Sequence, residues 1–223
     1  MNGEKIKYTV EFRKRKTIGI IIKENGEVIV RAPNGVSFET IDRVIEKKRK
    51  WIEQKVIMFK ERKQLASDEV MYLGRICKVR VIEQKFLKKN FVDFKNDTFF
   101  VNVSELSKAN KVLEKWFREE CLKKVTEIVF KYTNRFKEKP KEIRVKSQKT
   151  KWGCCTYDNK IFLNWHIIMA RESAMEYVVV HEMCHMVYKN HSKDYWKCVE
   201  NILPEFKKEH LYLKENGYLM KIK

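Results

Sequence analysis

Three histidines and a glutamate fall within one short segment, HEMCHMVYKNH, at positions 181–191. His181 and His185 are four residues apart, so on an α-helix both imidazoles lie on one face, one turn apart. Two neutral imidazoles at that spacing can share one Zn²⁺, and His191 offers a third nitrogen ligand. Three protein ligands with one open position are typical of a catalytic zinc site rather than a closed structural one.

Glu182 follows the first histidine directly, where its carboxylate can reach a water on the metal. Apolar residues flank the pattern at 177–180 and 186–188, which predicts a buried helix. Histidine and glutamate side chains in a buried helix are costly unless they are paired or bound to a metal. The surroundings therefore favour a metal site over a pair of hydrogen-bonded core histidines.

The ends of this helix can also be predicted. Ser173 and Glu176 form a Ser-x-x-Glu capping box, which predicts a helix start near Ala174. Asn190 suits a left-handed exit from the helix, and Ser192 suits the N-cap of the next one. His191 would then lie in the tight turn between two helices, folded back toward the metal.

The rest of the chain alternates between strand and helix patterns. The Asn25-Gly26 pair between two β-branched runs predicts a hairpin. The expected elements are β-structure over 5–32, a long helix over 38–64 capped by Ser37, strands over 70–103 with a turn at Asn96-Asp97, a helix over 105–137, short strands at 143–147 and 160–165, and a final helix over 193–215. We therefore expect a β-rich N-terminal part with one long helix at 1–104 and a metal-binding catalytic part at 105–223, which together can form one continuous domain.

Composition narrows the class of protein. With 223 residues and 43% hydrophobic content, the chain is long and apolar enough for a folded core. No apolar run approaches the roughly 20 residues of a membrane span, and the first residues carry no secretory signal. The six cysteines include no C-x-x-C pair, which argues against a four-cysteine zinc module. We expect a cytoplasmic protein with reduced thiols.

The formal net charge is +19, from 49 Lys and Arg against 30 Asp and Glu. A charge of this size favours acidic partners, including nucleic acid or nucleotides. The basic residues are spread along the chain, however, and do not form one recognised DNA-binding motif.

Several segments together resemble the YgjP-like metallopeptidase family, which is distantly related to SprT-like proteins. The matching segments are 13–33, 73–81, 149–168 and 177–200, including KTKWGCCTYDNKIFLNWHII and YVVVHEMCHMVYKNHSKDYWKCVE. The chain departs from the family at Cys154, where the Trp-Gly-Ser-Cys segment usually has serine. The resemblance implies a zincin-like α+β fold, a Zn²⁺ held by His181, His185 and His191, and a catalytic Glu182.

The leading hypothesis is zinc-dependent peptide hydrolysis, in which Glu182 activates a metal-bound water. One Zn²⁺ per chain is expected, although Ni²⁺, Co²⁺ or Fe²⁺ suit the same ligands. A peptide or protein substrate would lie along the edge of strand 160–165. The residues predicted to bind it are Lys151, Trp152, Asn164 and Tyr195.

Two alternatives follow from the charge. One is a metal-dependent nucleotide phosphohydrolase, against which the absence of a glycine-rich phosphate loop argues. The other is a non-enzymatic, zinc-stabilised domain associated with nucleic acid, which would give Glu182 no role. A further variant, a protease recruited to DNA-bound proteins, fits both the positive charge and the resemblance to SprT-like proteins. The sequence does not specify a substrate or an oligomeric state.

Overall fold

The computed structural model describes residues 5–23, 25–62 and 64–222. The chain forms two compact units, Met1–Gln64 and Leu65–Lys223. Residues 104–110, where the sequence suggested a boundary, lie within the second unit. The division into parts 1–104 and 105–223 stays a prediction.

The first unit is a three-stranded sheet with two helices. Strands β1 (Thr9–Arg13), β2 (Gly19–Ile22) and β3 (Val28–Pro33) are arranged in the order β1-β3-β2. β2 and β3 are antiparallel, as expected from the Asn25-Gly26 hairpin, and Gly26 has a φ of 84°. A left-handed φ of this kind is why glycine suits the second turn position.

The single helix predicted over 38–64 is wrong, and residue 63 lies outside the described residues. The segment forms α1 (Phe38–Lys47) and α2 (Arg49–Lys60), with Lys48 between them at φ −106° and ψ 6°. Ser37 caps α1 as predicted, because its side chain accepts from the Thr40 N–H at 3.3 Å. A straight helix of this length would span about 40 Å, roughly twice the length of a six-residue strand. The break lets both helices contribute isoleucines to one cluster with β3.

The second unit begins with a four-stranded sheet. Its strands are β4 (Glu69–Tyr72), β5 (Arg75–Glu83), β6 (Phe91–Lys95) and β7 (Thr98–Val103), in the order β4-β5-β7-β6. Asn96 and Asp97 form the predicted turn, with φ values of 50° and 53°. The β4–β5 turn contacts the segment before the histidine helix, because Leu73 and Gly74 donate to the carbonyls of Ile168 and Met169. This sheet is thereby tied to the element that precedes the site.

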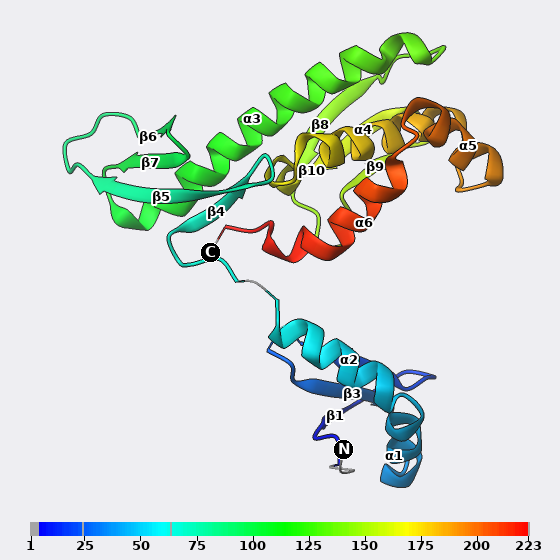
Figure 1. The fold of residues 1–223 in the computed structure, drawn as a ribbon. Helices are drawn as coiled ribbons and strands as arrows, with labels where there is room; N and C mark the ends of the chain where they lie inside the picture. Colours follow the sequence, from blue (N-terminus) through cyan, green and yellow to red (C-terminus); the bar gives the residue numbers. More distant parts are fainter. Residues whose placement is uncertain (1–4, 24, 63, 223) are drawn as a thin grey trace. The chain divides into compact units, whose positions relative to one another are not determined.

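A short 3₁₀ turn, η1 (Leu106–Lys108), leads into α3 (Ala109–Tyr132), which corresponds to the helix predicted over 105–137. α3 packs on β6 and β7 of the first sheet of this unit and on β8 (Glu142–Lys146) of the second (Figure 1). Another 3₁₀ turn, η2 (Thr133–Arg135), ends it.

The second sheet consists of β8, β9 (Gly153–Cys155) and β10 (Lys160–Asn164) in the order β8-β10-β9. β10 is parallel to β8 and antiparallel to β9. The expectation that strand 160–165 presents a free edge to substrate is therefore wrong, because β10 is paired on both sides. The edge strands of this sheet are β8 and β9, and β9 lies between the two short strands that the sequence predicted.

Helix α4 (Glu172–Val187) follows η3 (Trp165–Met169) and carries the HExxH segment. It begins two residues before the predicted start, after Arg171, and no side chain caps it. The predicted capping box does not form, because Ser173 lies inside the helix rather than at its N-cap, and Glu176 pairs with Lys131 of α3 at 2.6 Å.

The final helix predicted over 193–215 is also divided. It forms α5 (Lys193–Ile202) and α6 (Phe206–Asn216), followed by η4 (Gly217–Leu219). The break falls at Leu203, whose φ of −131° and ψ of 86° are non-helical. Leu203 precedes Pro204, and a residue before proline is disfavoured in the helical region.

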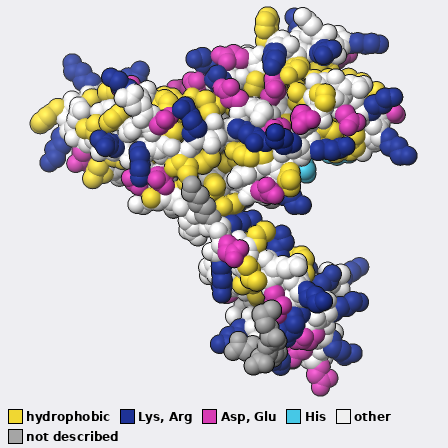
Figure 2. Space-filling view, in the orientation of Figure 1, with side chains coloured by type: hydrophobic (Ala, Val, Ile, Leu, Met, Phe, Trp, Pro, Cys, Tyr) yellow, Lys and Arg dark blue, Asp and Glu magenta, His cyan; other side chains and the backbone are white. Residues whose placement is uncertain are grey.

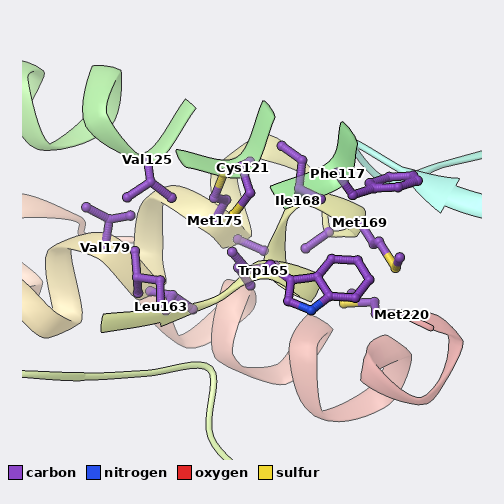
Figure 3. Packing of buried hydrophobic residues seen from close by; sticks show 14 of the residues in the cluster. Phe117, Cys121, Val125, Leu163, Trp165, Ile168, Met169, Met175, Val179 and Met220 are labelled. Carbon is purple, nitrogen blue, oxygen red and sulfur yellow. The ribbon is translucent and has the colours of Figure 1, made fainter. Parts of the chain in front are cut away.

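The main core lies between α3, α4, η3 and β10. Figure 3 shows apolar side chains from these elements interdigitating, and most of them are completely buried. The labelled members are Phe117, Cys121, Val125, Leu163, Trp165, Ile168, Met169, Met175, Val179 and Met220. One side of α4 is thus packed into the core. The other side, which carries His181 and His185, lies at the candidate site.

No helix in the described ranges is both long enough and apolar enough to cross a membrane. On the face shown in Figure 2, lysine and arginine side chains are scattered over each unit rather than gathered in one patch.

An ion pair fixes α6 against the start of α4. The Arg171 guanidinium donates to both carboxylate oxygens of Glu209, at 2.8 and 3.0 Å, and the Glu209 side chain is 11% exposed. Arg171 also lies over the Tyr212 ring, 4.2 Å from its centroid.

We predict that Glu209→Gln destabilises the protein by about 1–2 kcal/mol, because it leaves Arg171 without its carboxylate. The value is modest because the Arg171 side chain is 35% exposed. Urea unfolding measures the change. The control is Glu119→Gln, which removes an exposed pair with Lys115 at 3.8 Å and should cost no more than about 0.5 kcal/mol. Equal losses in the two variants would contradict the role assigned to Glu209.

Candidate metal and catalytic site

The histidine face of α4 places two imidazoles together. Tyr177, Val178, Val179 and Val180 are buried, as the flanking apolar residues predicted, whereas His181 and His185 are only partly buried. The four-residue spacing brings both rings to the same side, with centroids 5.1 Å apart.

The turn after α4 returns His191 to this face. α4 ends before Tyr188, whose φ of −117° and ψ of 107° are extended. Asn190 does not adopt the predicted positive φ; its side-chain oxygen instead accepts from the Ser192 N–H at 3.2 Å. Ser192 caps α5 as predicted, accepting from the Tyr195 N–H at 3.3 Å. These local bonds hold the turn closed between the two helices.

The three Nε2 atoms converge. His191 Nε2 lies 3.1 Å from that of His185 and 3.2 Å from that of His181. Two nitrogens bound to one tetrahedral zinc at 2.0–2.1 Å are about 3.3–3.4 Å apart, close to these separations. The three histidines are the group of possible metal ligands found in the described part of the chain. Their donor type and spacing fit a metal ion with a nitrogen ligand set.

Neighbouring groups hold each ring in place. His185 Nδ1 lies 2.9 Å from the Tyr188 carbonyl oxygen, which assigns the proton to Nδ1 and leaves Nε2 free to bind a metal. The Tyr195 ring stacks on His185, with centroids 4.5 Å apart, and its hydroxyl donates to the His181 carbonyl oxygen at 3.1 Å. Trp196 stacks on His191 at 5.4 Å.

Two of the imidazoles, those of His181 and His185, are held neutral. Burial, reinforced by the neighbouring imidazoles, lowers the pKa of His181 to about 3. Burial also lowers the pKa of His185, against the effect of its bond to the Tyr188 carbonyl. Neutral imidazole is the form that binds a metal, so these rings do not have to lose a proton at neutral pH.

Glu182 lies beneath strand β9. It is 5% exposed, and burial raises its pKa to about 8, partly offset by the Lys151 ammonium and by a hydrogen bond from the Cys155 backbone N–H. β9 approaches so closely that a Cβ on Gly153 would lie 2.7 Å from Glu182 Oε1 and 2.7 Å from Leu163 Cδ2. A larger residue at 153 could therefore fit only if the Glu182 and Leu163 side chains or the strand shifted.

A cleft of about 690 Å³ opens beside the three histidines and Glu182. Of the residues predicted to bind substrate, Lys151 and Trp152 line it. Asn164 is 6% exposed, and its amide donates to the carbonyls of Gln148 and Lys151, at 2.8 and 3.1 Å. Asn164 lines a neighbouring pocket of about 570 Å³ instead. Tyr195 is fully buried beneath the histidines.

The cleft also contains residues that the sequence analysis did not assign to the site. These are Tyr177, Lys189, Trp196, His210 and Lys214, together with the β9 backbone. Tyr177 precedes His181 by four residues, so helical spacing carries a signal for it. His210 and Lys214 come from α6 and have no comparable local signal. Cys154, which replaces the usual serine, lines the cleft and accepts from the Gln148 amide at 3.5 Å.

A family model described as "YgjP-like, metallopeptidase domain" matches residues 16–216. The chain belongs to this family. The match covers both units and includes every residue of the histidine cluster and Glu182. The YgjP-like metallopeptidase domain, its α+β fold and its three-histidine candidate metal site therefore agree with the expectations from the sequence.

Two solved structures are similar over parts of the chain. The crystal structure of the metallopeptidase zymogen of Pyrococcus abyssi abylysin has 21% identity and a TM-score of 0.34, over 46% of this chain and 95% of that one. The metallopeptidase zymogen of Methanocaldococcus jannaschii jannalysin has 21% identity and a TM-score of 0.35, over 44% and 89%. No curated protein matches the chain.

We predict that Zn²⁺ raises the melting temperature of the chelator-treated protein. A metal bound by the folded state alone, present at about 100 times its Kd, adds about 2.7 kcal/mol of stability. His185→Ala should lose most of this shift, because it removes one of three converging nitrogens. Glu182→Gln is the matched control and should retain the shift, since all three histidines remain. Scanning calorimetry with added metal gives the measurement, and an undiminished shift in His185→Ala would count against the site.

A second prediction concerns pH in the chelator-treated protein. Glu182 has a pKa raised to about 8 when folded, against an ordinary value of about 4.5. Its contribution to stability is therefore fully present below pH 4.5 and is lost as pH rises through 8. Relative to wild type, Glu182→Gln should gain roughly 2–4 kcal/mol between pH 5 and pH 9.

Urea unfolding at the two pH values measures this gain. Glu215→Gln is the control, because it removes an exposed carboxylate of α6 and keeps Glu182. A Glu182→Gln variant with the same pH slope as wild type would show that the carboxylate is not held in a buried, proton-binding environment.

Proposed function

We propose that the protein is a zinc-dependent peptidase. The observation that carries the proposal is the convergence of three imidazole nitrogens beside a buried glutamate with a raised pKa, at the edge of a β-strand. Three histidine ligands suit Zn²⁺, with one ion per chain. When bound, the metal would supply Lewis-acid chemistry, lowering the pKa of a water and polarising the scissile carbonyl.

Glu182 would move the proton. Burial holds its pKa near neutrality, where a carboxylate can accept a proton from the attacking water and return it to the leaving amine. The Cys155 N–H and the Lys151 ammonium stabilise its ionised form. Together these groups would leave a fraction of Glu182 ionised and able to act as a base. Its pKa would still be high enough for the carboxylate to accept a proton readily.

Strand β9 would bind the substrate backbone. Asn164 N–H donates to the Trp152 carbonyl and Thr156 N–H to the Lys160 carbonyl, so the backbone groups of residues 152 and 156 point toward β10. Along an antiparallel strand, successive residues point their backbone N–H and C=O groups alternately toward and away from the partner strand. The N–H and C=O groups of Gly153 and Cys155 therefore point away from β10. The cleft lies along this free edge, and an extended peptide can add to it as a further strand.

His210 would supply a second donor for the developing oxyanion. Its Nδ1 lies 3.2 Å from the Tyr177 hydroxyl, and both residues line the cleft. Tyr177 also contacts the His181 ring, with centroids 5.7 Å apart, which links this pair to the metal ligands. Tyr195, which the sequence predicted to bind substrate, instead donates its hydroxyl to the His181 carbonyl oxygen.

The two alternatives find less support. Phosphohydrolase sites commonly use carboxylate ligands and two metals, whereas the described cluster contains histidines alone. A nucleic-acid-associated domain would be expected to gather its basic side chains, and these are scattered on the face shown in Figure 2. A cytoplasmic location stays a prediction from the sequence.

The test compares the zinc-loaded protein with Glu182→Gln on a panel of unstructured peptides and nucleoside triphosphates. We expect peptide cleavage in wild type and a loss of about 10²–10⁴-fold in kcat for Glu182→Gln. Metal analysis should show equal zinc in the two proteins, which separates catalysis from metal loss. Glu182-dependent phosphate release with intact peptides would instead establish the phosphohydrolase alternative, and activity unchanged in Glu182→Gln would exclude both.

A further inference from the structure

The charged side chains that line the cleft are mainly positive. Three lysines line it, namely Lys151, Lys189 and Lys214, and of the described lining residues Glu182 is the one acid. Glu182 is almost fully buried under β9, and the Cys155 N–H donates to its carboxylate, so it exposes little negative charge at the cleft surface. A bound ligand therefore meets mainly positive charge there.

Lys189 is held in position by neutral groups. Its ammonium donates to the Asn159 side-chain oxygen at 2.7 Å and to the Thr156 carbonyl at 3.4 Å, and lies 5.6 Å from the Tyr157 ring centroid. These partners fix the ammonium beside the turn that follows β9 without cancelling its charge. A cation placed in advance loses less side-chain entropy when an anion binds.

Lys214 lies across the cleft on α6, one turn after His210. Within the ranges that the structure describes, it makes no ion pair with a carboxylate. The buried carboxylate of Glu209 anchors α6 to Arg171, so the helix that presents Lys214 is fixed. Lys151 lies at the other end of β9 from Lys189 and acts on Glu182 itself.

We propose that the preferred substrates are peptides with acidic side chains close to the cleaved bond; this rests on the peptidase function proposed above. Lys151 and Lys189 flank the two ends of β9, and Glu182 lies beneath its middle. A peptide paired with β9 advances about 3.3 Å per residue, so residues within about three positions of the cleaved bond can reach these lysines. Charge complementarity in a cleft raises association rates and excludes partners of the same charge.

The experiment uses three peptide series with one cleavable core and acidic, neutral or basic flanks. For the zinc-loaded wild-type protein at low salt, kcat/KM should be at least about tenfold higher for acidic than for basic flanks, and the ratio should shrink as salt rises. Lys189→Met and Lys214→Met should each lower the ratio about threefold. The matched control is Lys123→Met, which removes an exposed lysine of α3 and should leave the ratio unchanged.

Binding separates this proposal from the function on which it rests. Fluorescence anisotropy measures the same labelled peptides on zinc-loaded Glu182→Gln protein. Cleavage without charge preference would overturn the acidic-substrate proposal and leave the peptidase intact. Charge-selective binding that depends on Lys189, with no cleavage in wild type, would support the selectivity and overturn peptide hydrolysis. Lys189-dependent binding of an oligonucleotide more tightly than of the acidic peptide would overturn the proposal in favour of nucleic acid.

Discussion

The structure of the second unit depends on burying a helix that carries polar side chains. α4 packs its apolar side into the core formed with α3, η3 and β10, which removes the backbone and most of its side chains from water. Two imidazoles and a carboxylate on such a helix carry a desolvation cost, which must be met by hydrogen bonds or by an ion. The Tyr188 carbonyl oxygen beside His185 Nδ1 and the Cys155 N–H beside Glu182 each meet part of it. His181 Nδ1 is buried and has no hydrogen-bond partner among the described residues. The cost of burial also shifts the pKa values toward the neutral forms, so packing and the chemistry of the site have one cause.

The metal cluster could be predicted because its geometry is local. The four-residue spacing of His181 and His185 fixes their relation on any helix, and the Ser192 cap lies next to His191 in sequence. The errors in the helices arose where a distant residue or the shape of the core decided the outcome. Glu176 would complete a capping box in an isolated helix, but Lys131, 45 positions away, takes its carboxylate. The long helix expected over 38–64 breaks at Lys48, where the chain must turn to pack. The exception is the helix expected over 193–215, whose break at Leu203 has a local cause in Pro204.

The cleft was harder to predict because tertiary contacts create most of it. β9 contains Gly153, Cys154 and Cys155, with no β-branched residue and no alternation, and it is a strand because β10 pairs with it. The sequence therefore indicated β10 as the edge strand beside the cleft, whereas that edge belongs to β9. His210 and Lys214 reach the site because α6 packs on α4 and because Glu209 ties it to Arg171. Such tertiary contacts join residues that are far apart in the sequence, so they leave no periodic pattern from which they could be predicted.

In the proposed mechanism, β9 joins substrate binding to proton transfer. The edge of the strand that faces the cleft is the one whose Cys155 N–H donates to Glu182, so a peptide paired there would lie beside the carboxylate that takes the proton. Since that N–H is already engaged, the outward groups left for the peptide are the Gly153 N–H and carbonyl and the Cys155 carbonyl. A Cβ at 153 would lie 2.7 Å from Glu182 Oε1, so a side chain there would displace either the strand or the carboxylate. The absence of a side chain at Gly153 is thus what would let one strand edge serve the substrate backbone and the general base together.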